Sequence, residues 1–172
     1  MRKIPFHRRV NVMLIDFIVG LVYSILIMLL IWVILVGVLD GIPRLSHIQI
    51  QVLAIFSLTT PLILLFTALE MLRPYGSFGK RLAGLRLNYT KTSFVSSFIR
   101  NTFKFLPWIM IQAGVIGMFY SNYIWWWFCL IPLGTVYGCI NIWMIKTRED
   151  GRHIADFVAG TYVIDCGADE DM

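Results

Sequence analysis

The fold is decided by the sequence RRVNVMLID at residues 8–16 and by the stretch that follows it, FIVGLVYSILIMLLIWVILVGVL at residues 17–39. These 23 uncharged residues are enough for an α-helix to cross a hydrocarbon layer roughly 30 Å thick. Asp16 stands where this helix would enter lipid, so we expect other segments to supply a partner for its carboxylate. The apolar run is longer than that of a cleavable signal peptide and ends without an A-x-A-like site, which predicts a retained transmembrane helix.

The composition indicates an integral membrane protein. Hydrophobic residues make up 58% of the 172 residues and charged residues 15%, too few charges for a water-facing surface of ordinary size. The net charge of +5 comes from cations that flank apolar stretches, so we expect a lipid bilayer and no nucleic acid as a partner. Cys129 and Cys139 have no metal-binding spacing, and we expect them to be small buried hydrophobes, with no metal or cofactor.

Four spans are predicted, at residues 12–39, 48–69, 105–120 and 123–145. The uncharged run from 105 to 145 is too long for one crossing, so we divide it at Tyr120 to Asn122. The third span is short, and its first turns are expected to continue an amphipathic helix that starts after Ser93. Pro61 should free the carbonyl of Ser57, either as a tolerated kink or as a broken helix that lines a cavity. Gly134 and Gly138 have GxxxG spacing, which favours internal packing over dimerisation.

Two polar segments join or follow these spans. In the loop between spans two and three, Phe78, Leu82 and Leu85 share one helical face, which predicts an amphipathic segment in the membrane interface. The alternation from residue 85 to 89 fits a short strand equally well. After the fourth span, a short amphipathic helix should end at Gly160. Residues 162–164 would form a short strand or a lipid-facing end, and residues 165–172 an acidic, disordered tail.

The distribution of basic residues predicts the orientation. Four Lys and Arg precede span one, seven lie between spans two and three, and three follow span four, whereas Arg44 alone lies on the other side. Because basic residues favour the cytoplasmic side, both termini should be cytoplasmic, in the cell membrane. The predicted fold is therefore an all-α integral membrane protein: a four-helix transmembrane bundle with a cytoplasmic amphipathic loop and a short amphipathic C-terminal helix.

This topology gathers five charged residues at the cytoplasmic face: Arg9, Asp16, Glu70, Arg100 and Asp156. A carboxylate at the edge of lipid tends to find a cation. Arg9 lies seven residues before Asp16, about 10.5 Å along the helix, and its side chain leans away from the aspartate. Arg100 is therefore the expected partner of Asp16, with Asp156 nearby.

Four short motifs carry a family resemblance. They are Arg9 and Asp16 with six residues between them, GSFGKRLAGLR at residues 76–86, SFIRN at 97–101, and RHIADFVAGT at 152–161. In this order the chain resembles the RDD family of small membrane proteins, from Arg8 to about Ile164. The family is named for an arginine and an aspartate in its first helix and an aspartate after its last, which Arg9, Asp16 and Asp156 match.

The resemblance implies one domain over residues 1–164, with Gly79, Lys80 and Arg81 as a loop motif. GSFGK lacks the glycine spacing and the final Ser or Thr of a phosphate-binding loop. Ser77 stands where the family commonly has Gln-Thr, and we give its hydroxyl no role.

The resemblance implies a fold more than an activity, because family members have been proposed both as transporters, including cation/proton exchangers, and as accessory parts of membrane complexes. We favour an accessory or assembly module whose partner is another membrane protein or a second copy of the chain. The alternative is a transporter, for example a monovalent cation/proton antiporter with Asp16 as its titrating carboxylate. His7, His47 and His153 are scattered along the sequence, so we do not expect an enzyme.

Overall fold

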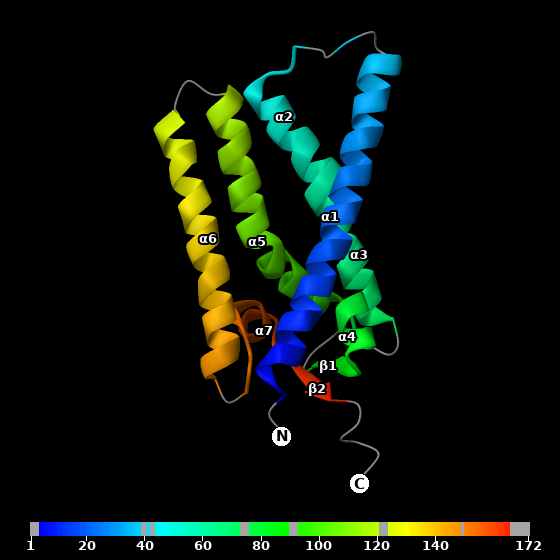
Figure 1. Cartoon of the computed structure of the whole chain (residues 1–172), viewed down its shortest axis with the longest axis vertical. Helices are drawn as coiled ribbons and strands as arrows, with labels where there is room; N and C mark the ends of the chain where they lie inside the picture. Colours follow the sequence, from blue (N-terminus) through cyan, green and yellow to red (C-terminus); the bar gives the residue numbers. More distant parts are fainter. Residues whose placement is uncertain are drawn as a thin grey trace.

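Four long helices form the body of the molecule (Figure 1). The computed structural model describes residues 4–38, 41, 44–72, 76–89, 93–120, 124–148 and 150–165. Four helices in these ranges are long and apolar enough to cross a membrane, over Phe6–Gly37, His47–Met71, Phe94–Tyr120 and Trp125–Thr147. Their outward faces expose large apolar side chains, as lipid contact requires.

The elements follow one another up and down the bundle. The first span is α1 (Phe6–Gly37), and the second consists of α2 (His47–Ala54), the π-helical turn η1 (Ile55–Thr59) and α3 (Thr60–Met71). The third and fourth are α5 (Ser93–Tyr120) and α6 (Ile124–Thr147). Between and after them lie α4 (Phe78–Leu82), α7 (Ile154–Ala159) and the strands β1 (Leu85–Tyr89) and β2 (Thr161–Asp165).

These four short elements lie at one end of the bundle, where α1 and α5 begin and α3 and α6 end (Figure 1). We call it the charged end. The third helix already begins at Ser93, ahead of the predicted span at 105, so the amphipathic segment and the span are one helix.

The prediction of an all-α fold is wrong in one respect, because β1 and β2 form a two-stranded antiparallel sheet. Leu85, Leu87 and Val163 point inward from this sheet and pack with Val12 of α1 into a small apolar core. The period-2 pattern at residues 85–89 thus marks a strand. Asp165, which we assigned to the acidic tail, is the last residue of β2, and the rest of that tail lies outside the described residues.

The second span accommodates Pro61 with a π-helical turn. Pro61 cannot donate a backbone hydrogen bond, and the turn η1 directly precedes the helix that contains it. The hydroxyl of Tyr23 donates to the carbonyl oxygen of Ser57 at 2.8 Å, so α1 satisfies the carbonyl that Pro61 was predicted to free. Insertions of this kind locally bend a helix without breaking it.

Helices α5 and α6 pack closely because glycines line their contact. A Cβ on Gly117 would lie 2.1 Å from the ring of Trp127, and one on Gly134 would lie 2.8 Å from the carbonyl oxygen of Pro107. Gly138 has no neighbour within 4 Å of such an atom. Only the first glycine of the GxxxG pair therefore serves internal packing.

Two further expectations differ from the structure. Cys129 and Cys139 are exposed on the outside of α6 and are free thiols, not buried ones. In the loop, Phe78 and Leu82 are exposed but Leu85 is buried, and Lys80 points inward with only 3% exposure. Leu85 belongs to the strand, so these three apolar residues do not form one helical face.

Candidate functional site

A cluster of buried charges connects the elements of the charged end. It consists of three carboxylates and four cations, which we call the charge cluster: Arg9, Asp16, Glu70, Lys80, Arg100, Lys104 and Asp156. Six of these residues are less than 9% exposed, and the side chain of Lys104 is 20% exposed. Charges this deeply buried need partners, because an unpaired ion in such a site lowers the stability of the fold by roughly several kcal/mol.

Glu70, at the end of α3, is the centre of the cluster and is completely buried. Its Oε1 accepts hydrogen bonds from Lys80 Nζ at 2.5 Å and from Arg100 Nη1. Its Oε2 accepts from Asn101 Nδ2 at 2.9 Å and from Ser97 Oγ at 3.2 Å. One carboxylate thus ties α3 to α4 and to one face of α5.

Arg100 extends the cluster to the C-terminal segment. Its Nε donates to Asp156 Oδ1 at 2.6 Å, and the same oxygen accepts from Thr161 Oγ1 at 3.3 Å. His153 caps α7: its Nδ1 accepts a hydrogen bond from the backbone N–H of Asp156. In return, the backbone N–H of His153 donates to Asp156 Oδ2. Asp156 therefore fixes α7 and the start of β2 against α5.

Asp16 is held by a different set of donors. Its Oδ2 accepts from Lys104 Nζ at 2.7 Å and from Ser77 Oγ at 2.8 Å, and its Oδ1 accepts from the backbone N–H of Gly79 at 3.1 Å. The prediction that Arg100 pairs with Asp16 is wrong. Lys104 lies one helical turn further along α5 and reaches Asp16, while Arg100 is engaged by Glu70 and Asp156.

Arg9 and Arg81 bind backbone instead of carboxylates. Arg9 Nη1 donates to the carbonyl oxygen of Gly151 at 3.0 Å, in a turn where Gly151 has φ +60°. Arg81 Nη2 donates to the carbonyl oxygen of Leu69 at 2.9 Å, among the last carbonyls of α3 that lack an intrahelical partner. Arg9 is thus no direct partner of Asp16, as its spacing predicted.

The structure brings all five predicted cluster residues to one end of the bundle, and it adds residues that we did not predict to contact the cluster. Lys104, Ser77, Ser97, Asn101 and His153 all contact a cluster carboxylate. Lys104 could have been found, because it stands four residues after Arg100 on the same face of the helix. The hydroxyl of Ser77, to which we gave no role, is fully buried against Asp16.

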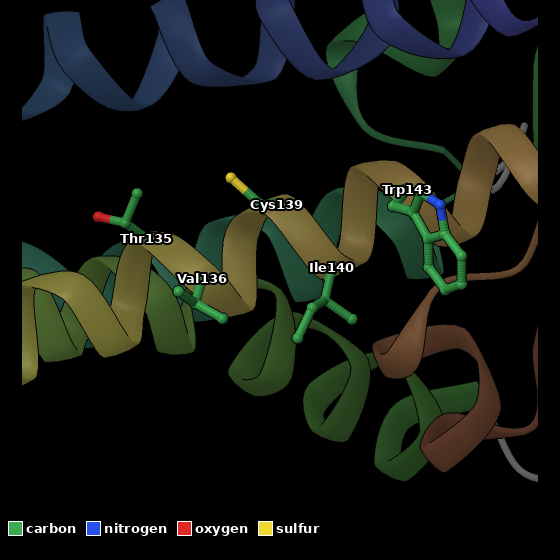
Figure 2. A pocket seen from close by; sticks show the side chains of 5 residues that line it. All are labelled: Thr135, Val136, Cys139, Ile140 and Trp143. Atoms are coloured by element: carbon green, nitrogen blue, oxygen red, sulfur yellow. The ribbon is translucent and has the colours of Figure 1, made fainter.

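A cavity of about 300 Å³ adjoins this cluster between α1, α3 and α5. Asp16 and Lys104 lie on its wall, and most of the remaining wall is apolar. A second pocket, of about 260 Å³, lies on the outer face of α6. Figure 2 shows the side chains that line it. Its lining contains no charged side chain, so it has no link to the cluster. Within the described ranges, no three His, Cys, Asp or Glu side chains gather where they could hold a metal ion.

Burial shifts the protonation equilibria of three groups outside the spans, Lys80, His153 and Asp156. Burial, with a further contribution from Arg100, lowers the pKa of Lys80 to about 8, although Glu70 opposes this shift. Burial alone would raise the pKa of Asp156, but His153 and Arg100 outweigh it and lower that pKa below the ordinary value. Burial also lowers the pKa of His153 to about 4, so its imidazole is neutral at pH 7.

The His153 shift predicts a loss of stability on acidification. Between pH 6.5 and 4 the unfolded chain protonates this histidine and the folded protein does not, so the unfolding free energy falls as the pH falls, by at most about 1.4 kcal/mol per pH unit. His153→Asn keeps a capping side chain but cannot titrate. We expect its thermal midpoint in detergent to fall less than that of the wild type between pH 6.5 and 5. Equal falls in both proteins would contradict this assignment.

Comparison with known proteins adds one finding to this geometry. The model of the RDD family matches residues 4–160. No match was found among curated proteins or among solved structures.

Proposed function

The chain belongs to the RDD family of membrane proteins, and from this premise we propose that it is an accessory or assembly module of a membrane complex. In this role the charge cluster fixes α4, α7 and the sheet to the four spans. The charged end then offers a rigid surface to another membrane protein or to a second copy of the chain. The charges act as structural anchors and do not bind a transported ion.

The observation that carries this proposal is the complete engagement of the buried carboxylates. Glu70 accepts from four donors on two segments, and Asp16 and Asp156 each accept from three. A carboxylate that exchanges ions must release its partners in each cycle. Donors that come from packed helices and from backbone N–H groups favour a fixed role.

We further propose that the charged end faces the cytoplasm of the cell, with both termini on that side. Fourteen of the 15 Lys and Arg belong to the segments of this side, and Arg44 alone to the other. A C-terminal fusion to a reporter that is active only outside the cytoplasm should therefore remain inactive. Activity of that reporter would contradict this orientation and place the C-terminus on the other side of the membrane.

One observation favours the alternative, a cation/proton antiporter. Asp16 lies on the wall of the 300 Å³ cavity, so it is the cluster carboxylate with a route toward the bilayer interior. Against this reading, the described carboxylates gather at one end of the spans, whereas transporters place their sites near the midplane. The proposal includes no catalysis.

Asp16→Asn separates the two functions. As an anchor, Asp16 is held by charge-assisted hydrogen bonds, so its loss should lower the unfolding free energy by about 2 kcal/mol and reduce the yield of folded protein in detergent. The exposed Asp150→Asn, whose wild-type carboxylate pairs with Arg148 at 3.1 Å, should change little.

An antiporter instead predicts that Asp16→Asn folds normally and fails to exchange ions. Purified wild-type protein in lipid vesicles should then move Na⁺ or K⁺ against H⁺, and Asp150→Asn should do so equally well. If the wild type exchanges ions and a stable Asp16→Asn variant does not, the proposal of an accessory module is overturned. A stoichiometric partner or a stable oligomer recovered from native membranes would support it.

A further inference from the structure

The cavity beside Asp16 and Lys104 has the character of a lipid site, and we propose that it binds an anionic glycerophospholipid. The headgroup would lie against Lys104 at the charged end, with one acyl chain between α1, α3 and α5. Three features of the described residues carry this inference: the charge balance of the cluster, the free coordination of Lys104, and a buried donor without a partner.

The charge cluster carries an excess of positive charge. Its four cations exceed its three carboxylates by one, and His153 adds no charge because burial keeps it neutral at pH 7. The neighbouring pair of Arg8 and Asp165 is balanced. A buried excess of one positive charge favours an anion at the place where the cluster is accessible.

Lys104 is that place. Its side chain is 20% exposed, more than any other member of the cluster shows in the described structure, and it lies on the cavity wall. Of its three N–H donors, one meets Asp16, and the ammonium also sits 4.5 Å from the centre of the Phe66 ring. This leaves room for a further acceptor on the side of the cavity.

A second donor lies deeper along the same helix. Trp108 also lines the cavity, and its indole Nε1–H is buried without a hydrogen-bond partner among the described residues. Four residues of helix separate it from Lys104, about 6 Å along the axis. A glycerophospholipid presents an anionic headgroup first and ester carbonyls a few bonds deeper, so its headgroup would lie at the level of Lys104 and its carbonyls at the level of Trp108. Buried indole N–H groups usually do find an acceptor.

The remaining walls suit an acyl chain. They are formed by apolar side chains of α1, α3 and α5, including Phe17, Leu21 and Leu62. Gly20 widens the cavity, because a Cβ at this position would meet only Leu62 Cδ1, at 4.0 Å. The side chain of Ser24 is occupied by the carbonyl of Gly20 and adds no unsatisfied polar group.

The experiment measures lipid retention by the purified wild-type protein with native mass spectrometry. Delipidated protein in detergent is incubated with dioleoylphosphatidylglycerol, dioleoylphosphatidylcholine, oleate or glycerol 3-phosphate. We expect one phosphatidylglycerol per chain, retained about fivefold better than phosphatidylcholine, the preference that one basic residue gives for an anionic lipid. Oleate lacks the ester carbonyls and glycerol 3-phosphate lacks the chain, so both should be retained less.

Two variants with matched controls assign the site. Gly20→Leu fills the cavity and leaves every ion pair intact, so it should abolish retention, whereas Gly138→Leu on the open face of α6 should not. Lys104→Gln should remove the preference for phosphatidylglycerol, and Lys146→Gln, an exposed cation near the end of α6, should keep it.

Equal retention of phosphatidylglycerol and phosphatidylcholine by the wild type would overturn the proposal without any variant. Unchanged retention by a folded Gly20→Leu protein would also overturn it. Full competition by glycerol 3-phosphate would assign a free phosphate to Lys104 and exclude the acyl chain.

Discussion

Glu70→Gln is expected to destabilise the protein by about 3–5 kcal/mol, the cost of removing one member of a buried ion pair and leaving the others. The substitution keeps the size of the side chain, so it tests charge and not packing. It leaves Lys80 without its carboxylate in a site where the lysine is 3% exposed, and it deprives Arg100 of one of its two acids. The thermal midpoint in a mild detergent should fall by on the order of 10 °C.

The double variant Glu70→Gln with Lys80→Met provides the internal control. It returns the cluster to its wild-type net charge, because one carboxylate and one ammonium are lost together. Replacing a buried ion pair by an apolar group is often nearly neutral, so the double variant should be more stable than Glu70→Gln alone. A midpoint for Glu70→Gln within error of the exposed Asp150→Asn would show that the cluster does not stabilise the fold.

The sequence predicts the membrane architecture because the signal is physical and local. A run of about 20 uncharged residues can only be buried in lipid or in a large core, and uncharged runs long enough for four crossings, with the basic residues concentrated on one side, fit a bundle. The gathering of Arg9, Asp16, Glu70, Arg100 and Asp156 follows from that topology alone. Arg9, Asp16, Glu70 and Arg100 lie at the charged ends of their spans and Asp156 follows the fourth span at that end, and a bundle brings such ends together.

The pairing inside the cluster could not be predicted in the same way. Arg100 and Lys104 lie on one face of α5, so either could reach Asp16 if helix depth and rotation are unknown. The choice is made by α4, which places Ser77 and Gly79 over Asp16, and by Glu70 and Asp156, which engage Arg100. These contacts join residues that are up to 63 positions apart, and no local pattern encodes them.

The sheet illustrates the same limit. The alternation of Leu85, Leu87 and Tyr89 indicates a strand, but its partner strand is about 75 residues away and begins only after α7. Asp165 is acidic and adjoins an acidic tail, which favoured a disordered reading. Its ion pair with Arg8 spans 157 residues and appears only once the two ends of the chain have met.

The substitution Gly79→Ala gives the second large effect on stability. It should destabilise the protein, whereas replacing an ordinary helix glycine by alanine stabilises it. Gly79→Ala places a Cβ 2.4 Å from the carbonyl oxygen of Val12 and 3.1 Å from Asp16 Oδ1, so α4 must move away from α1. This movement lengthens the hydrogen bonds from Gly79 N–H and Ser77 Oγ to Asp16. Overpacking costs about 1–3 kcal/mol and weakened bonds to a charged group add to it, so we expect a loss of about 3 kcal/mol.

Gly138→Ala is the matched control, because the same substitution in α6 meets no atom within 4 Å and replaces a poor helix former by the best one. It should leave the thermal midpoint unchanged or raise it, while Gly79→Ala lowers it. If the damage at Gly79 is transmitted through Asp16, the double variant of Gly79→Ala with Asp16→Asn should lose less stability than the sum of the single variants. Strict additivity would mean that α4 is held by its apolar contacts alone and that the carboxylate of Asp16 does not fasten the loop to the first span.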